Sequence, residues 1–102
     1  MSDKPFKQFE RTCAALINGV RFPANQGGKV DVKSDRILGQ CKLVQALSLA
    51  EMTRLVVEIE AEAEKVGKRG MLFVKLRSGK GRPTPLLVVM SGAKWRAWYE
   101  PT

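Results

Sequence analysis

The stretch of residues 48–90 constrains the fold most strongly. It begins with a capping box, in which Ser48 is the N-cap and Glu51 occupies the third helical position. The helix that follows ends at Gly67 and places apolar residues on one face, namely Leu49, Met52, Leu55, Val56, Ile59, Ala63 and Val66. Residues 71–76 and 86–90 are nearly continuous apolar runs, as expected of central strands that are covered on both faces. A helix that leads into two such strands predicts an α/β fold.

The N-terminal half completes the pattern. Residues 5–18 predict a helix, with Pro5 in its first turn and Gly19 at its C-terminal end. Residues 20–23, 30–32 and 37–44 predict strands, and a turn at 33–36 joins the last two as a hairpin. The predicted order is α-β-β-β-α-β-β, a mixed central β-sheet flanked by helices in one domain of residues 1–102.

The C-terminal aromatic residues leave two questions open. Residues 94–99 fit either a strand or a short helix. Trp95, Trp98 and Tyr99 lie beside Lys94 and Arg96, so they either stack on bases or close the core. We expect core closure.

The charge distribution indicates a polyanionic partner. The chain of 102 residues has 18 Lys and Arg against 10 Asp and Glu, a net charge of +8. No acid lies between Lys65 and Arg96, whereas acids gather between Glu51 and Glu64. Each phosphate that such a surface neutralises releases counterions, so nucleic acid is the expected partner, with solubility alone as the alternative. The hydrophobic fraction of 44% excludes a disordered basic tail.

The composition also excludes several kinds of chemistry. Histidine is absent, which removes histidine-based triads, metal ligands and general bases. Cys13 and Cys41 lack CxxC spacing, and we expect buried free thiols. No apolar run approaches a membrane span, and the start lacks the apolar core of a signal peptide, so we expect a cytoplasmic protein with no membrane partner. Any metal would be held by oxygen, as Mg²⁺ and Mn²⁺ are, and no small-molecule cofactor is expected.

Glu10 is an acid beside an apolar stripe. The stripe of the first predicted helix consists of Phe6, Phe9, Cys13, Leu16 and Ile17. At roughly 100° per residue, Glu10 falls on the same side of that helix. It is therefore either a flanking residue that reaches water or a functional carboxylate.

Three more polar residues join Glu10 in a candidate site. Alternation along strand 37–44 places Gln40 and Lys42 on one face, which we expect to be the outer face, and sends Cys41 into the core. Asp31 lies between two core-directed valines of the preceding strand and can share that outer face. Two acids, an amide oxygen and an ammonium then converge at one sheet edge, as Mg²⁺-dependent phosphodiester hydrolysis requires. Taken singly, Asp31 as a hairpin-edge charge and Lys42 as a solvated strand residue are the alternatives.

These residues carry a resemblance to a known superfamily. The runs Gly28-Lys29-Val30-Asp31 and Ile37-Leu38-Gly39-Gln40-Cys41-Lys42 resemble the D…(E/Q)xK core of the PD-(D/E)xK nucleases. The upstream Glu10, the Gly-rich loop and the later long helix are similar in order to archaeal-type Holliday junction resolvases. The Gln-x-Lys form resembles instead the Mrr-like restriction endonucleases. The resemblance spans roughly residues 6–90.

The resemblance implies a role for each matching residue. Asp31 would be the principal metal ligand, Gln40 would offer its side-chain oxygen, and the backbone carbonyl of Cys41 would be a further ligand. Lys42 would be the catalytic lysine, and Glu10 an outer ligand or a water-holding residue. Glutamine in place of the usual glutamate removes one negative charge, which weakens metal affinity and leaves a two-metal arrangement open.

The resemblance also implies a substrate and an assembly. The expected function is a Mg²⁺-dependent endonuclease that resolves Holliday junctions, working as a two-fold homodimer in a phage or archaeal replication system. The alternatives are a non-catalytic nucleic-acid-binding module and a general nuclease acting on flaps or single strands. The expected DNA contacts are Arg21, Asn25, Gln26, Lys29, Lys68, Arg69, Lys80 and Arg82.

Overall fold

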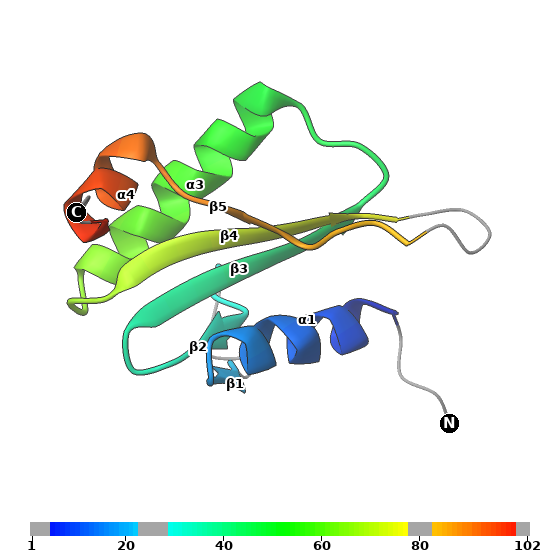
Figure 1. Ribbon diagram of the computed structural model, residues 1–102, viewed down its shortest axis with the longest axis horizontal. Coiled ribbons are helices and arrows are strands. Elements are labelled where there is room, and N and C mark those ends of the chain that lie inside the picture. The colour runs from blue at the N-terminus through cyan, green and yellow to red at the C-terminus, as the bar shows by residue number, and fades with distance from the viewer. Residues whose placement is uncertain (1–4, 23–28, 78–82, 100–102) are drawn as a thin grey trace.

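The computed structural model describes residues 5–22, 29–77 and 83–99. Its elements are α1 (Pro5–Leu16), β1 (Val20–Arg21), β2 (Val32–Lys33), β3 (Ile37–Val44), α3 (Leu49–Glu64), β4 (Arg69–Leu76), β5 (Leu87–Val89) and α4 (Gly92–Trp98). The predicted α/β class and the order α-β-β-β-α-β-β are confirmed, and α4 decides the open question in favour of a helix (Figure 1). Among the helices of the described residues, none is long and apolar enough to cross a membrane.

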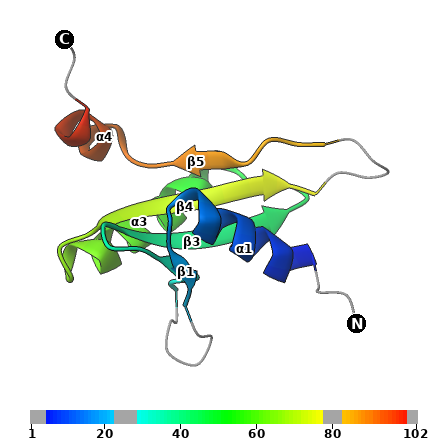
Figure 2. The same ribbon diagram turned by 60° about the horizontal axis from the view of Figure 1, so that its bottom comes forward.

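The five strands form one mixed sheet in the order β1-β2-β3-β4-β5. β1, β2 and β3 are antiparallel neighbours, and β5 is antiparallel to β4. β3 and β4 run parallel, with Ile37 opposite Arg69 and Val44 opposite Leu76. α3 is the crossover that connects these two parallel strands. Figure 1 shows α1 and α3 on opposite faces of the sheet, and Figure 2 shows β1 and α4 towards opposite edges.

The core has two halves, one on each face of the sheet. The cluster under α1 consists of Phe9, Cys13, Ala14, Val32, Cys41, Met71 and Phe73. The clusters under α3 consist of Val30, Leu38, Leu55, Val56, Ile59, Ala63, Leu72 and Val74. β3 and β4 are therefore covered on both faces, as predicted for residues 71–76.

The prediction of a second central strand at 86–90 is wrong. β5 pairs only with β4, and its Leu87 and Val88 are both exposed. It is an edge strand because no further strand follows it in the described part of the chain. The apolar faces of the helices are likewise shorter than predicted: Phe6 and Leu16 of α1, and Leu49 of α3, lie beyond the reach of the sheet and are exposed.

The end of α1 also differs from the prediction. The helix ends at Leu16 rather than at Asn18, and Asn18 adopts the left-handed conformation with φ 53°. Gly19 is needed for another reason, since a Cβ atom there would collide with the backbone carbonyl of Lys33. The close approach of α1's exit to β2 therefore depends on this glycine.

The aromatic residues of α4 do not close the core. No residue of α4 is buried, and Trp95, Trp98 and the adjoining Tyr99 are all exposed. The expectation of core closure is wrong because α1 and α3 already cover the two faces of the sheet. The aromatic side chains remain on the surface.

Candidate active site

Asp31 lies immediately before β2, where the chain enters the sheet. Its Oδ2 atom accepts a hydrogen bond of 2.8 Å from the backbone N–H of Cys41, and its own N–H donates to the carbonyl of Gly39 at 2.8 Å. The carboxylate takes the place of a backbone acceptor where the β2–β3 ladder ends. The N–H and C=O of one strand residue point to the same side, so the Cys41 carbonyl also faces this edge.

The two valines beside Asp31 point into different halves of the core. Val30 packs under α3, whereas Val32 packs under α1. The expectation that both point to one core, opposite Asp31, is wrong because the sheet is covered on both faces. Asp31 is half-buried at the edge between the two halves.

Glu10 reaches the same edge from α1. The residue is 8% exposed, which confirms its position on the buried side of the helix and contradicts the alternative of a solvated flank. Its Oε1 atom accepts a hydrogen bond of 3.1 Å from Nε of Arg21 and lies 3.0 Å from Nη2 of the same residue. Since Arg21 belongs to β1, this ion pair ties α1 to the sheet edge.

The two carboxyl groups act on each other. Burial is the main cause that raises the pKa of Asp31 above its ordinary value, and the hydrogen bond from the Cys41 N–H opposes it. Repulsion by the Glu10 charge and a hydrogen bond with the Glu10 carboxyl raise that pKa further, whereas the positive charge of Lys42 lowers it. Two acids held together at a partly buried edge favour a bound cation or a proton between them.

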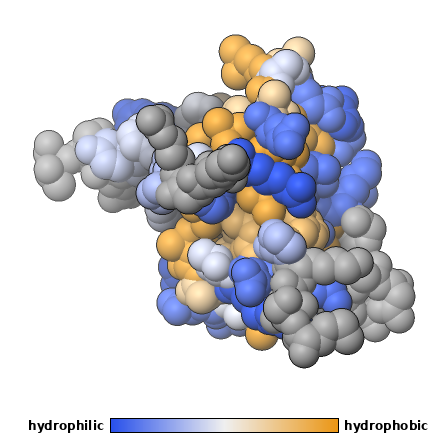
Figure 3. Space-filling view, turned by 90° about the vertical axis from the view of Figure 1, so that its right-hand side faces the viewer, coloured by the Kyte–Doolittle hydropathy of each residue, from blue (hydrophilic) through white to orange (hydrophobic). Residues whose placement is uncertain are grey.

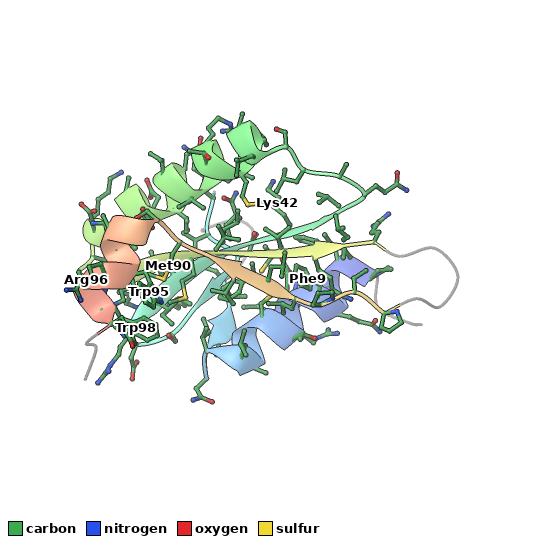
Figure 4. All side chains as sticks on the ribbon, turned by 45° about the horizontal axis from the view of Figure 1, so that its top comes forward. Phe9, Lys42, Met90, Trp95, Arg96 and Trp98 are labelled. Carbon is green, nitrogen blue, oxygen red and sulfur yellow. The ribbon has the colours of Figure 1, made fainter. Side chains whose placement is uncertain are left out.

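Gln40 and Lys42 share one face of β3, as alternation predicted, but this face is not an outer one. Leu38 and Val44 on the same face pack in the clusters under α3. Gln40 is buried, and Lys42 is half-buried on the α3 side of the sheet (Figure 4). The expectation of an outer face is wrong because the sheet lies between two helices at β3. Cys41 enters the core under α1, as predicted.

The amide oxygen of Gln40 is unsatisfied. Its Oε1 atom is buried and has no hydrogen-bond partner within the described residues. A buried polar atom without a partner costs about 1 to 3 kcal/mol. This position therefore favours a cation or a hydrogen-bond donor from outside the described residues.

The candidate ligand atoms are oxygens, the donors that a hard divalent cation prefers. Within residues 5–22, 29–77 and 83–99, no group of three or more His, Cys, Asp or Glu side chains is placed to hold a metal ion. The carboxylates of Glu10 and Asp31 would therefore need neutral oxygens to complete a ligand set. Gln40 Oε1 and the Cys41 carbonyl are oxygens of that kind, and all-oxygen sets suit Mg²⁺ and Mn²⁺.

Two of the predicted DNA contacts, Arg21 and Lys68, donate side-chain hydrogen bonds within the described residues. Arg21 pairs with Glu10, and Lys68 donates a hydrogen bond of 2.7 Å from Nζ to the carbonyl of Ser34. The pairing of Arg21 was missed in the sequence analysis, although a buried acid needs a cation and Arg21 is the basic residue of the next strand. Arg21 is thus part of the candidate site.

The other predicted DNA contacts have different surroundings. Lys29 Nζ lies 3.8 Å from a carboxylate oxygen of Glu58, with 55% of its side chain exposed. The guanidinium of Arg69 lies 6.0 Å from the ring centre of Trp98. The remaining predicted contacts lie outside the described residues: Asn25, Gln26, Lys80 and Arg82.

The cysteines are core residues. Cys13 and Cys41 are both free and buried in the cluster under α1, as predicted. A hydrogen bond with Cys13, and then burial, raise the pKa of the Cys41 thiol. A thiol held in its protonated form is a poor nucleophile, so the chemistry available at this edge comes from the carboxylates and Lys42.

A large pocket lies elsewhere on the molecule. It has a volume of about 680 Å³ and opens between α1 and the ends of β3 and β4, with Phe9, Leu43 and Leu76 among its lining residues. Figure 3 faces this end of the molecule and shows apolar residues gathered there. None of the four candidate residues lines this pocket. The candidate site is a partly open sheet edge rather than a deep cavity.

Comparison with protein-family models, with curated proteins and with solved structures gives no significant match. The similarity to the PD-(D/E)xK nucleases therefore stays a prediction that rests on the residues themselves.

Proposed function

We propose that this protein is a Mg²⁺-dependent, structure-selective DNA endonuclease of the PD-(D/E)xK type that acts on four-way junctions. One observation carries the proposal: the buried Glu10 pairs with Arg21, which lies opposite Val32 in the β1–β2 ladder, so this acid lies close to Asp31. The charges of Glu10 and Lys42 both act on the Asp31 carboxyl group. Two acids with a neighbouring ammonium are the groups that phosphodiester hydrolysis uses to hold a cation and to balance charge at phosphorus.

The oxygen atoms at the edge would hold the cation. Asp31 is oriented by the Cys41 N–H, and Glu10 is oriented by Arg21. Gln40, whose side chain lies on the α3 side of β3, would add a neutral oxygen. The ligand set would then carry less negative charge than one built from three acids. When bound, Mg²⁺ supplies Lewis-acid polarisation of the scissile phosphate.

Lys42 would act on the phosphate itself. Hydrolysis joins a water oxygen to phosphorus and breaks one phosphorus–oxygen ester bond, so negative charge grows on the phosphate oxygens. An ammonium donates hydrogen bonds to those oxygens or to the attacking water and stabilises that charge. The chain has 18 basic residues and 10 acidic ones, and this excess of positive charge would attract DNA to the protein.

A two-fold homodimer would present two such sites and cut two strands symmetrically. The test compares a four-way junction, a flap and a linear duplex, each with Mg²⁺ and with EDTA, at a protein concentration where sedimentation gives the oligomeric state. We expect a dimer that cuts the junction fastest and only with metal. Equal rates on all three substrates would indicate a general nuclease. Binding without cleavage in either Mg²⁺ or Mn²⁺ would indicate a non-catalytic module.

A variant pair tests the role of Lys42. Lys42→Ala should lower the cleavage rate by roughly 100-fold or more, since removing one preorganised donor at developing charge costs that much. Junction binding in EDTA should be kept. Lys65→Ala is the matched control, because it removes the same charge from an exposed position at the end of α3. Equal losses of cleavage in the two variants would contradict the role given to Lys42.

A further inference from the structure

α4 is held in place by polar contacts rather than by a buried face. Ser91 caps the helix, since its Oγ accepts a hydrogen bond from the N–H of Lys94 at 3.3 Å. The N–H of Ser91 donates to Oε2 of the buried Glu60 at 2.8 Å, and Lys94 forms an ion pair with Glu64. The acids of α3 thus fix α4 while its aromatic side chains stay in solvent.

The exposed aromatic residues form a compact surface. Trp95, Trp98 and Tyr99 are 43%, 54% and 46% exposed. The rings of Trp95 and Tyr99 stack on each other with centres 4.5 Å apart. Figure 4 shows Trp95 and Trp98 at the end of the molecule occupied by α4, with Arg96 at the outer margin. Aromatic groups that are held outward at no gain in core packing indicate a surface that meets a ligand.

Trp98 lies beside arginines. A pocket of about 360 Å³ is lined by Arg36, Arg69 and Trp98, and Asp35 also lines it. The Arg69 guanidinium lies 6.0 Å from the centre of the Trp98 ring. In the part of the chain that the structure describes, neither Arg36 nor Arg69 forms an ion pair. The pocket therefore offers an aromatic face next to two cations.

The chemistry of this surface selects its partner. A flat aromatic ring beside guanidinium groups fits a nucleobase followed by its phosphate. Duplex DNA hides its base faces within the stack, so only unpaired bases can use such a ring. Two arginines and one acid, Asp35, line the pocket. A second copy of this chain would bring the arginines of two such pockets together, whereas a polyanion is attracted to them.

We propose that α4 and the adjoining arginines form a binding site for single-stranded DNA, in which Trp98 stacks on an unpaired base and Arg36 and Arg69 contact the flanking phosphates. The inference rests on the proposed function for its choice of DNA, and it adds that the substrate presents unpaired bases near the branch point. α4 lies towards the opposite edge of the sheet from β1, the strand that carries Arg21 of the candidate active site (Figure 2).

The test uses the tryptophan content of the chain. Trp95 and Trp98 are the 2 tryptophans, so the Trp95→Phe protein reports on Trp98 alone. Oligothymidylate of about eight nucleotides, a length within the usual range of single-strand sites, is titrated in EDTA. We expect the Trp98 fluorescence to be quenched on saturation. The anisotropy of labelled DNA shows when the protein is saturated. Trp98 fluorescence that is unchanged at that point would overturn the proposal.

Affinity measurements on variants give the second readout. Trp98→Ala should weaken oligothymidylate binding on the order of tenfold, and Trp98→Phe, which keeps a ring, should weaken it less. Arg36→Ala should reduce the salt slope of log K by about 0.7, the value for one phosphate contact on a single strand. Leu49→Ala is the control, since Leu49 is an exposed apolar residue of α3, and it should bind as wild type does.

Two outcomes count against the inference without touching the nuclease proposal. The first is that Trp98→Ala binds DNA as tightly as wild type. The second is that Trp98→Ala changes the oligomeric state with DNA binding unchanged, which would assign this surface to a second copy. Loss of Asp31 should leave oligothymidylate binding intact. If the protein never cuts DNA but Trp98 still governs single-strand binding, the inference stands and the nuclease proposal fails.

Discussion

The carboxylate of Asp31 accepts a 2.8 Å hydrogen bond from the backbone N–H of Cys41. This contact ends the β2–β3 ladder with a charged group instead of a carbonyl, and it holds that group against Glu10. The same strand carries Gln40 and Lys42 on either side of Cys41. Three consecutive residues of β3 therefore supply the Gln40 amide, the Cys41 N–H that binds Asp31, and the Lys42 ammonium of the candidate site.

Asp31→Asn should stabilise the metal-free protein at neutral pH. Asparagine keeps an oxygen for the Cys41 N–H and removes a charge that burial and Glu10 disfavour. Because the pKa of Asp31 is raised in the folded state, the ionised carboxylate lowers the stability of the fold above that pKa. This loss of stability disappears as the pH falls through that pKa and the group takes up a proton. Wild type should therefore gain stability from this group as the pH is lowered from 7, and the variant should lack that gain. Thermal unfolding across this pH range measures both effects.

Two comparisons control this prediction. Asp31→Ala should be less stable than Asp31→Asn by about 1 to 2 kcal/mol, because the Cys41 N–H loses its acceptor. Mg²⁺ should raise the unfolding temperature of wild type and not that of Asp31→Asn. If Asp31→Asn were less stable than wild type at pH 7 in EDTA, the fold would not disfavour the charge of Asp31.

Arg21→Ala should destabilise the protein by about 1 to 2 kcal/mol, less than for a fully buried pair because Arg21 is partly exposed. Glu10 is 8% exposed, and its carboxylate would lose the cation that its Oε1 atom contacts. In a Glu10→Gln background the same change should cost much less, since no buried charge is left unpaired. Chemical denaturation of wild type, the two single variants and the double variant gives the coupling free energy between Arg21 and Glu10. Equal costs of Arg21→Ala in both backgrounds would contradict the pairing.

Gly39→Ala should destabilise the protein by about 1 to 3 kcal/mol. A Cβ atom at Gly39 would collide with the ring of Phe73 and a methyl group of Val32, both fully buried. Gly39 also accepts the hydrogen bond from the Asp31 N–H, so the strain should reach the candidate site. Gly92→Ala is the control, because nothing lies within 4 Å of a Cβ there. Its stability should stay within about 0.5 kcal/mol of wild type, and similar losses in both variants would contradict this packing.

Local patterns predicted most of the elements. The N-cap of α3 is an example: the Ser48 Oγ accepts a hydrogen bond from the Glu51 N–H at 3.1 Å. The Glu51 side chain, however, binds Arg54 instead of returning to the cap. Such signals depend on neighbours a few residues apart, and for that reason they can be read from one sequence.

The orientation of the site residues depends on distant parts of the chain. Alternation placed Gln40 and Lys42 together, but only the packing of α3 decides that their face is covered. Arg21 pairs with Glu10 because β1 lies beside α1, and the tertiary fold sets that proximity. Trp98 is exposed because α1 and α3 cover the two faces of the sheet and leave no face for α4. In each case the orientation of the side chain depends on which elements pack together in the tertiary structure.

The most direct test of the account measures cleavage of a four-way junction by wild type in Mg²⁺ and in EDTA, beside Asp31→Asn and Lys42→Ala, with binding of each protein to the junction measured in EDTA. The account predicts metal-dependent cleavage by wild type, and cleavage at least roughly 100-fold slower in both variants, with binding and folding kept. Intact junctions in the presence of bound, folded wild type and Mg²⁺ or Mn²⁺ would contradict it, as would cleavage by Asp31→Asn at the wild-type rate.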